Sequence, residues 1–515
     1  MNSRNSQCIR KSKLFLALVT VVFVQSLCLA VYYFPSENAG VLREEQEEIL
    51  IGFDGTEFTD DVILSKIGES HPNVLVAYLD DDGPRFNSTC GHYCNPLDIH
   101  YNNIYWQTQK TKNASYFLYG AYYDDRPAAK KRIIRIITMT DQYTISESAT
   151  CLIWFGNEAP AITRVFDYQF MWYNHWGKNG ATLFPYLLSC EIPLEYGNQV
   201  PDSVSLVGNP CDRATNNLKL VHNLAPEGEK KDFVVCVKAL NFEHDAYMAI
   251  RLVEWIEMLK ILGADKVVFY ELHVHENITR ILEHYKRMGN IEVVKTTLPG
   301  HSANIPHFMT TYLQKKQYGV RRFQEVIEIN DCFYQNMYKY RYVVLLDVDE
   351  LIVPRGDLLT WQQLVYDVTL PKAKNIPYAT LIARNVYFMD EKKELQDWYF
   401  NIPKYMHMLQ NVRRNKEYEE PGTGIKAFHN TDLVLALHNH FAIACLGGHT
   451  TWCEYVDFDL EDAHLQHYCY GRRKYECMTK NDGNLTVDAN IWKYNTELIS
   501  EVKKTLRQTG FLRKK

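Results

Sequence analysis

The chain has 515 residues and a net charge of −6, and its length allows one large domain or two ordinary ones. Its hydrophobic fraction of 46% is ordinary for a globular protein and allows a sizeable core. Because the charge balance is slightly acidic, the sequence lacks the basic character of nucleic-acid-binding proteins, and we expect no nucleic-acid partner.

The first predicted element is a membrane-spanning helix over residues 14–34. These 21 residues carry no charge, and at about 1.5 Å per residue they can cross a hydrocarbon core of about 30 Å. Basic residues precede the segment and glutamates follow it, so we expect the tail 1–13 in the cytosol and the remainder in the lumen. A cleaved signal peptide is the alternative, with Ser26–Ala30 as a loose cleavage site.

Two regions of different character follow the apolar segment. Residues 35–70 are acidic and poor in aromatic side chains, so we expect a stem there. Residues 71–229 show short apolar runs separated by turn residues, which is typical of antiparallel β structure. We therefore predict a β-rich N-terminal domain over 71–229, ended by a polar segment at 226–232.

From residue 233 the pattern alternates between strand and helix. Candidate strands cover 233–237, 267–271 and 291–294, and candidate helices cover 245–262 and 278–288. A glycine follows each helix and ends it. This βαβαβ order predicts a parallel sheet with right-handed crossovers within a domain over the remainder of the chain.

The cysteines and the glycosylation acceptors agree with a secretory route. Eleven cysteines follow the apolar segment, so at least one should remain free or pair between chains. We expect Cys236, inside an apolar strand, to be a free buried thiol. Cys90 and Cys94 are too few ligands for a zinc site, and the lumen favours disulfides. The possible acceptors are Asn87, Asn113, Asn277 and Asn484.

Asp347 and Asp349 directly follow the apolar strand Tyr342–Leu346. In open α/β sheets, ligands bind beyond the carboxyl ends of the strands. An Asp-x-Asp there can hold a divalent cation that is shared with the phosphates of a nucleoside diphosphate. The alternative is a strand that ends in a solvated acidic turn, since so short a motif also occurs by chance.

Several other segments occur in order around this motif. They are Val234–Lys238 followed by Glu254 and Trp255, then Asn330–Tyr334, Tyr340–Tyr342, Leu345–Glu350 and Ala463–Tyr468. Together they resemble glycosyltransferase family 92, and the resemblance covers about residues 115–475. It implies an α/β fold in which residues 230–515 form an A-type glycosyltransferase domain, a Rossmann-like mixed sheet with flanking helices. It also implies an inverting galactosyltransferase that uses UDP-galactose, anchored in the Golgi membrane as a single-pass type II protein.

The resemblance also suggests which residues bind the metal and the donor. Asp347 and Asp349 would hold Mn²⁺ or Mg²⁺, with Asp349 as the more direct ligand. A-type enzymes often add a late histidine, here His467, with His438 as its competitor. Lys238 would contact the UDP-sugar, because A-type enzymes bind base and ribose after the first strand, although a solvated lysine at a strand end is an equal alternative.

The roles of several other polar residues are suggested only by their positions in the sequence. Glu350 is expected to position the loop, and Arg384 and Lys426 are candidates for phosphate binding. Inverting transfer needs a general base, which would stand between the Asp-x-Asp and the late histidine. The sequence does not choose among the six candidates Asp390, Glu391, Asp397, Glu417, Glu419 and Glu420.

The leading hypothesis is a metal-dependent transferase that moves a hexose, with galactose expected, from UDP onto a glycan acceptor. One alternative is the same fold with another UDP-sugar. A second is a catalytically inactive, membrane-tethered glycan-binding protein, but such a protein would not need Asp347 and Asp349. The acceptor, the linkage and the oligomeric state do not follow from the sequence.

Overall fold

The computed structural model describes residues 68, 74–75, 90–173, 176–177, 180–315, 318–374, 376–390, 398–447, 453–469 and 484–513. The expected membrane helix at 14–34 and the tail before it lie outside these residues, as does the expected stem apart from residue 68. Among the helices that are described, none is long and apolar enough to cross a bilayer.

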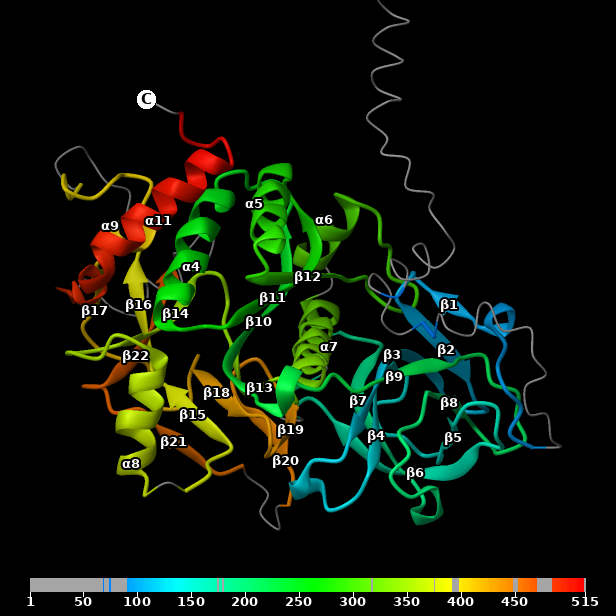
Figure 1. Ribbon diagram of the computed structural model, residues 1–515. Helices are drawn as coiled ribbons and strands as arrows, with labels where there is room; N and C mark the ends of the chain where they lie inside the picture. Colours follow the sequence, from blue (N-terminus) through cyan, green and yellow to red (C-terminus); the bar gives the residue numbers. More distant parts are fainter. Residues whose placement is uncertain are drawn as a thin grey trace, which may run out of the picture. The chain divides into compact units, whose positions relative to one another are not determined.

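The first folded region is a nine-stranded sheet that closes on itself (Figure 1, blue to green). Its strands are β1 Tyr101–Asn102, β2 Trp106–Lys110, β3 Ser115–Asp124, β4 Ile133–Thr140, β5 Thr150–Trp154, β6 Ala161–Phe170, β7 Phe184–Glu191, β8 Ser203–Val207 and β9 Leu218–Val221. The order is β1-β2-β3-β4-β7-β6-β5-β8-β9, and a parallel pairing of β9 with β3 closes the ring. The other neighbours are antiparallel, as the short apolar runs predict.

A seven-stranded mixed sheet begins at Lys231 (Figure 1). Its order is β12-β11-β10-β13-β18-β15-β21, and β12, β11, β10 and β13 are parallel. The strands are β10 Lys231–Phe242, β11 Lys266–Val274, β12 Ile291–Lys295, β13 Tyr340–Leu345, β15 Thr380–Ala383, β18 Lys426–Asn430 and β21 Tyr455–Asp457. The predicted βαβαβ unit and its parallel sheet are therefore confirmed.

Four helices accompany the strands of this unit, and α4 shows how its sequence sets its two ends. They are α4 Met248–Leu262, α5 Glu276–Arg287, α6 Phe308–Lys315 and α7 Tyr318–Asn336. Asp245 Oδ1 accepts from the Met248 amide at 3.0 Å, which fixes the first turn of α4. Gly263 ends the same helix at φ 97°, a conformation that glycine adopts without strain.

Smaller elements complete the fold. A five-stranded sheet has the order β14-β22-β16-β17-β23. It consists of β14 Glu350–Pro354, β16 Asn385–Met389, β17 Arg413–Asn415, β22 Ala463–Cys469 and β23 Leu485–Val487. Further elements are the hairpin β19 Val434–Leu437 and β20 Ala442–Cys445, a π-helix at Gln363–Thr369, and the helices α8 Leu370–Lys372, α9 His407–Gln410 and α11 Asn495–Gln508.

Alternate residues of the parallel strands enter two different cores. Val234 and Val343 pack in the core that contains α7 and the closed sheet, whereas Phe233 and Val344 pack in the core that contains α4 and α5. This alternation is the period of two expected for a strand buried on both faces. Helix α7 consequently lies between the mixed sheet and the closed sheet.

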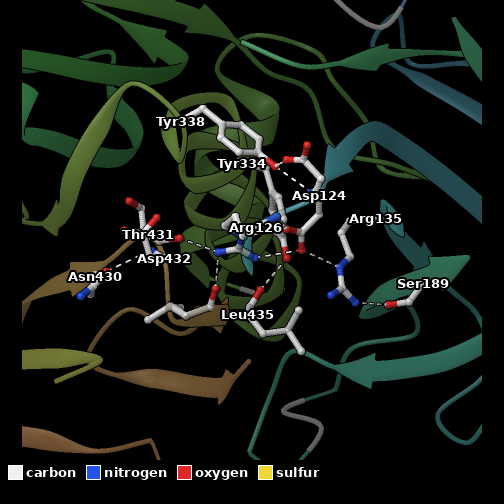
Figure 2. A network of polar contacts seen from close by, with 12 residues as sticks. Asp124, Arg126, Arg135, Ser189, Tyr334, Tyr338, Asn430, Thr431, Asp432 and Leu435 are labelled. Carbon is white, nitrogen blue, oxygen red and sulfur yellow. Dashed lines mark hydrogen bonds and ion pairs between the residues drawn. The ribbon is translucent and has the colours of Figure 1, made fainter. Parts of the chain in front are cut away.

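A buried polar network also links the closed sheet to the part of the chain that holds the mixed sheet (Figure 2). Arg126 and Arg135 both donate to the Asp124 carboxylate. Arg126 Nη1 donates to the carbonyls of Thr431 and Val434 at 2.6 and 2.7 Å. Burial favours the neutral acid, but the two arginines outweigh it and lower the pKa of Asp124. The network therefore ties the end of β3 to the turn between β18 and β19.

One cysteine prediction is wrong. Cys236 is not free, because it forms a disulfide with Cys332 of α7. Cys236 lies in an apolar strand, and its disulfide partner is 96 residues further along the chain, in a helix that packs on that strand. The sequence alone could not identify so distant a partner. Cys94 is the buried free thiol of the described residues, and burial raises its pKa to about 12. The other described disulfides are Cys90–Cys211, Cys151–Cys190 and Cys445–Cys453.

Candidate functional site

Asp347 and Asp349 lie in a tight turn between β13 and β14. The turn is closed twice: the Glu350 amide donates to the Asp347 carbonyl at 3.0 Å, and the Asp347 amide donates to Glu350 Oε2 at 2.9 Å. Because β13 already ends at Leu345, the carboxylates stand beyond the carboxyl end of a parallel strand. This is the edge where open α/β sheets bind ligands. Glu350 braces the turn, as the sequence predicted for it.

Asp347 is held between two lysines that come from neighbouring strands. Cys236 of β10 pairs with Leu345, so Lys238, two residues further on, reaches Asp347 Oδ1 at 3.2 Å. Lys426 starts the antiparallel neighbour β18 and approaches Asp347 Oδ2 at 3.4 Å. The Asp347 carboxylate is therefore neutralised by protein cations.

Lys426 is completely buried and does not fit the predicted phosphate-binding role. Its ammonium group contacts Asp347, Glu350 at 3.1 Å and the side-chain oxygen of Asn439 at 2.9 Å. Burial acts against the charge, but the two carboxylates outweigh it and raise the lysine pKa. Lys426 therefore stays charged and stabilises the acidic turn through its carboxylates. Lys238 differs, because 15% of its side chain is exposed and it keeps contact with solvent.

His467 faces Asp349 across the pair formed by β14 and β22. Glu350 lies opposite His467 in the antiparallel register, and the Tyr468 amide donates to the Asp349 carbonyl at 2.7 Å. His467 Nε2 is therefore 3.7 Å from Asp349 Oδ2. A carboxylate beside an imidazole is a donor pair that fits a divalent metal ion. Of the predicted ligands, the structure brings these two together and leaves Asp347 with the lysines.

The competing histidine, His438, lies in a different environment. Its ring packs against Trp172 and Trp176 at centroid distances of 5.1 and 4.5 Å. Burial and the nearby His440 and Arg322 hold its pKa well below the usual range, so the ring is neutral. His438 follows the strand β19, and the three described ion pairs of Asp349 and Glu350 are made with His467 and Lys426.

His438 lines a cavity of about 330 Å³. The lining consists of aromatic, histidine, arginine and glycine residues: Trp172, Trp176, Arg322, Gly422, Gly424, His438, His440 and Phe441. Asn439, between the two histidines that line the cavity, accepts from Lys426, which in turn contacts Asp347 of the acidic turn. Sequence reasoning missed the two tryptophans, although three aromatic residues within 170–173, at the end of β6 and just beyond it, were a usable signal.

The candidate general bases differ in surroundings. Asp390 contacts Arg251 at 3.0 Å and His407 at 3.4 Å. Burial favours its neutral form, but these two groups outweigh it and lower its pKa to about 2. A carboxylate with so low a pKa is a weak proton acceptor. Glu417 and Glu420 are exposed and Glu419 is half-buried, whereas residues 391 and 397 lie outside the described part of the chain. We assign no base.

Arg384 is engaged by the loop that follows β17. Its Nη2 donates to the Glu419 carbonyl at 3.0 Å, and its guanidinium lies 5.9 Å from the centroid of the Tyr418 ring. These contacts are made to protein groups, so the phosphate-binding role expected for Arg384 stays a prediction.

Comparison with known proteins assigns the chain to a family. The model of glycosyltransferase family 92 matches residues 231–502, which is more than half of the chain and includes Lys238, the acidic turn and His467. No curated protein matches the sequence. The crystal structure of residues 1–349 of TarS from S. aureus aligns at 10% identity and a TM-score of 0.24, over 54% of this chain and 74% of that one. By the family match, the chain belongs to glycosyltransferase family 92.

Proposed function

We propose that this family 92 glycosyltransferase transfers galactose from UDP-galactose to a glycan, with inversion and with a divalent metal ion. The observation that carries the proposal is the facing pair of Asp349 and His467 beside an Asp347 carboxylate that two lysines hold. These contacts lie at the carboxyl edge of the parallel sheet, where a nucleotide is bound in open α/β folds.

In this proposal each residue has a separate task. Asp349 and His467 hold Mn²⁺ or Mg²⁺, which when bound neutralises the diphosphate and stabilises it as a leaving group. Lys238 adds a positive charge next to the same turn and is oriented by Glu325 of α7 at 3.5 Å. Asp347 keeps Lys238 and Lys426 in position.

We further assign the acceptor glycan to the cavity lined by Trp172 and Trp176. Its volume of about 330 Å³ suits a sugar unit. Indole rings offer apolar faces and His440 and Arg322 offer polar groups, a combination that fits the two kinds of surface on a hexose. The closed sheet, which supplies the tryptophans, would then contribute to acceptor binding.

Donor hydrolysis tests the activity. The full chain, solubilised in detergent, is incubated with UDP-galactose, UDP-glucose, UDP-N-acetylglucosamine and UDP-N-acetylgalactosamine, with Mn²⁺ or with chelator. We expect UDP release from UDP-galactose only, and only with metal. Release from another donor would replace galactose by that sugar. No release from any donor, together with glycan binding, would identify an inactive glycan-binding protein.

We also propose that the protein resides in the Golgi membrane, with a cytosolic N-terminus and a lumenal catalytic region. The uncharged segment 14–34 and the basic residues before it support this orientation. The four described disulfides agree with an oxidising compartment.

A further inference from the structure

Glu243, His244 and His307 form a group of metal-ligating side chains that the proposed reaction does not use. One ligand atom from each residue lies within 4.8 Å of the others, and no other such trio occurs among the residues the structure describes. His307 Nδ1 is 2.9 Å from Glu243 Oε1, and His244 Nε2 is 3.8 Å from Glu243 Oε2. The two imidazole rings are stacked, 5.3 Å apart and 2° from parallel.

The backbone holds these residues from two separate segments. Glu243 and His244 directly follow β10, in a turn closed by the Asp245 amide donating to the Phe242 carbonyl at 3.3 Å. Asp245 Oδ1 also accepts from the Met248 amide at 3.0 Å, which fixes the turn against the start of α4. His307 directly precedes α6, and its carbonyl accepts from the Thr311 amide at 3.1 Å. The two segments are more than 60 residues apart in sequence.

Two further observations point to a ligand. The Glu243 side chain is only 11% exposed, and its Oε2 is buried without a hydrogen bond among the described residues. His307 adopts φ 64°, a left-handed conformation that is strained for a residue with a side chain. Strained backbone of this kind is found at ligand clamps. The imidazole of His307 is 73% exposed, and an ion pair to so exposed a group contributes little stability, so the ion pair alone does not account for the arrangement.

We propose that Glu243, His244 and His307 bind a zinc ion, with water as the fourth ligand. Two imidazoles and one carboxylate suit zinc better than Mn²⁺ or Mg²⁺, which prefer oxygen ligands. Tetrahedral zinc with bonds of about 2.0–2.2 Å needs ligand atoms roughly 3.3–3.6 Å apart, and the separations of 2.9 and 3.8 Å bracket that range. The bound ion would join the turn after β10 to the segment before α6. This site is independent of the proposed transferase activity.

Cobalt binding tests the site directly, because tetrahedral Co²⁺ has visible absorption and replaces zinc. The probe is CoCl₂ added to the untagged full chain in detergent, followed by ZnCl₂ as competitor. We expect one equivalent of Co²⁺ with the tetrahedral band, abolished by zinc. Glu243→Gln and His307→Ala should weaken binding by at least about 10- to 100-fold, the loss known for merely supporting residues of metal sites. His301→Ala removes an exposed histidine on the same segment and should retain the band.

Asp349→Ala separates this site from the proposed catalytic metal and should also retain the band. The proposal is overturned if His307→Ala and wild type bind equal amounts of cobalt, or if only Asp349→Ala removes the band. If His307→Ala does not fold, by near-ultraviolet circular dichroism, His244→Ala takes its place, since that ring is 67% exposed. A second readout is thermal unfolding: zinc should raise the midpoint of wild type and leave that of Glu243→Gln unchanged.

Discussion

Asp349 differs from Asp347 in a way that a single substitution can test. Its carboxylate faces an imidazole, whereas Asp347 is already neutralised by two lysines. Asp349→Asn should leave the fold intact and reduce transfer about a hundredfold or more, because a metal ligand supplies several kcal/mol and ~1.4 kcal/mol is tenfold in rate. The measurement is kcat with saturating Mn²⁺. Asp357→Asn, the same change at an exposed position, is the control. Activity of Asp349→Asn within a few-fold of wild type would remove Asp349 from the metal site.

We expect different effects from replacing His467 and His438. His467 lies 3.7 Å from Asp349, while His438 packs against two tryptophans. His467→Ala should raise the Mn²⁺ concentration needed for half-maximal activity by roughly 10- to 100-fold. His438→Ala should leave that concentration unchanged and instead raise KM for the acceptor glycan. If His438→Ala shifts the Mn²⁺ requirement and His467→Ala does not, the assignment is reversed.

Helix α7 carries a buried carboxylate whose protonation should appear in the stability of the fold. Asp331 accepts from the hydroxyls of Tyr122 in β3 and Tyr270 in β11. Burial raises its pKa to about 6, although the two hydroxyl groups act in the opposite direction. A pKa raised above the ordinary aspartate value of 3.8 means that the folded state favours the protonated acid. The stabilisation is complete below that ordinary value and is lost as pH rises through about 6.

Asp331→Asn should therefore flatten the fall in stability between about pH 4 and pH 6. The measurement is the urea midpoint of unfolding as a function of pH for wild type and variant. Comparison of the two proteins cancels other titrating groups, such as His440, whose pKa burial and Lys426 lower to about 3. Identical slopes in the two proteins would show that Asp331 has an ordinary pKa.

The polar network at the end of β3 should contribute measurably to the stability of the fold. Arg126 is 1% exposed and joins the Asp124 carboxylate to two carbonyls beyond β18 (Figure 2). Removing one member of a buried pair leaves the other without a partner and costs about 3–5 kcal/mol. Arg126→Met should therefore lower the free energy of unfolding by that amount in denaturant titrations. Arg164→Met, on the exposed side of β6, should change it by less than about 0.5 kcal/mol. A loss below about 1 kcal/mol for Arg126→Met would contradict a structural role for the network.

At the scale of the whole molecule, the sequence predicted the features that depend on neighbouring residues better than the contacts between distant residues. The alternation of strand and helix after Lys231 was readable because apolar spacing and glycine stops are local, and the acidic turn beyond β13 followed from the same pattern. The parallel closure of β3 by β9 was not readable, because about 100 residues separate these strands. The same applies to the Cys332 partner of Cys236 and to Trp172, which reaches His438 from the other half of the chain.

The arrangement of the candidate site shows the same division. Lys238, Asp347, Asp349 and His467 were all named from the sequence, and the register of β10, β13, β14 and β22 brings them to one edge. The sequence could not show that Asp347 is enclosed by lysines, because Lys426 arrives from an antiparallel strand about 80 residues later. The sequence suggested phosphate binding for Lys426, whereas in the structure its ammonium group supports the acidic turn.

The orientation of the whole protein in the membrane is tested by its glycans. Asn113 is exposed in the turn before β3, whereas Asn277 is half-buried in the first turn of α5. An exposed acceptor in a turn is reached more easily by the lumenal glycosylation machinery. Endoglycosidase should therefore increase the gel mobility of the cell-expressed protein, and Asn113→Gln should remove one glycan.

Protease added outside sealed vesicles should leave the chain beyond about residue 35 intact, because the positive side of the apolar segment stays cytosolic. Unchanged mobility together with full digestion would place the folded region in the cytosol, and the proposed Golgi arrangement would have to be abandoned.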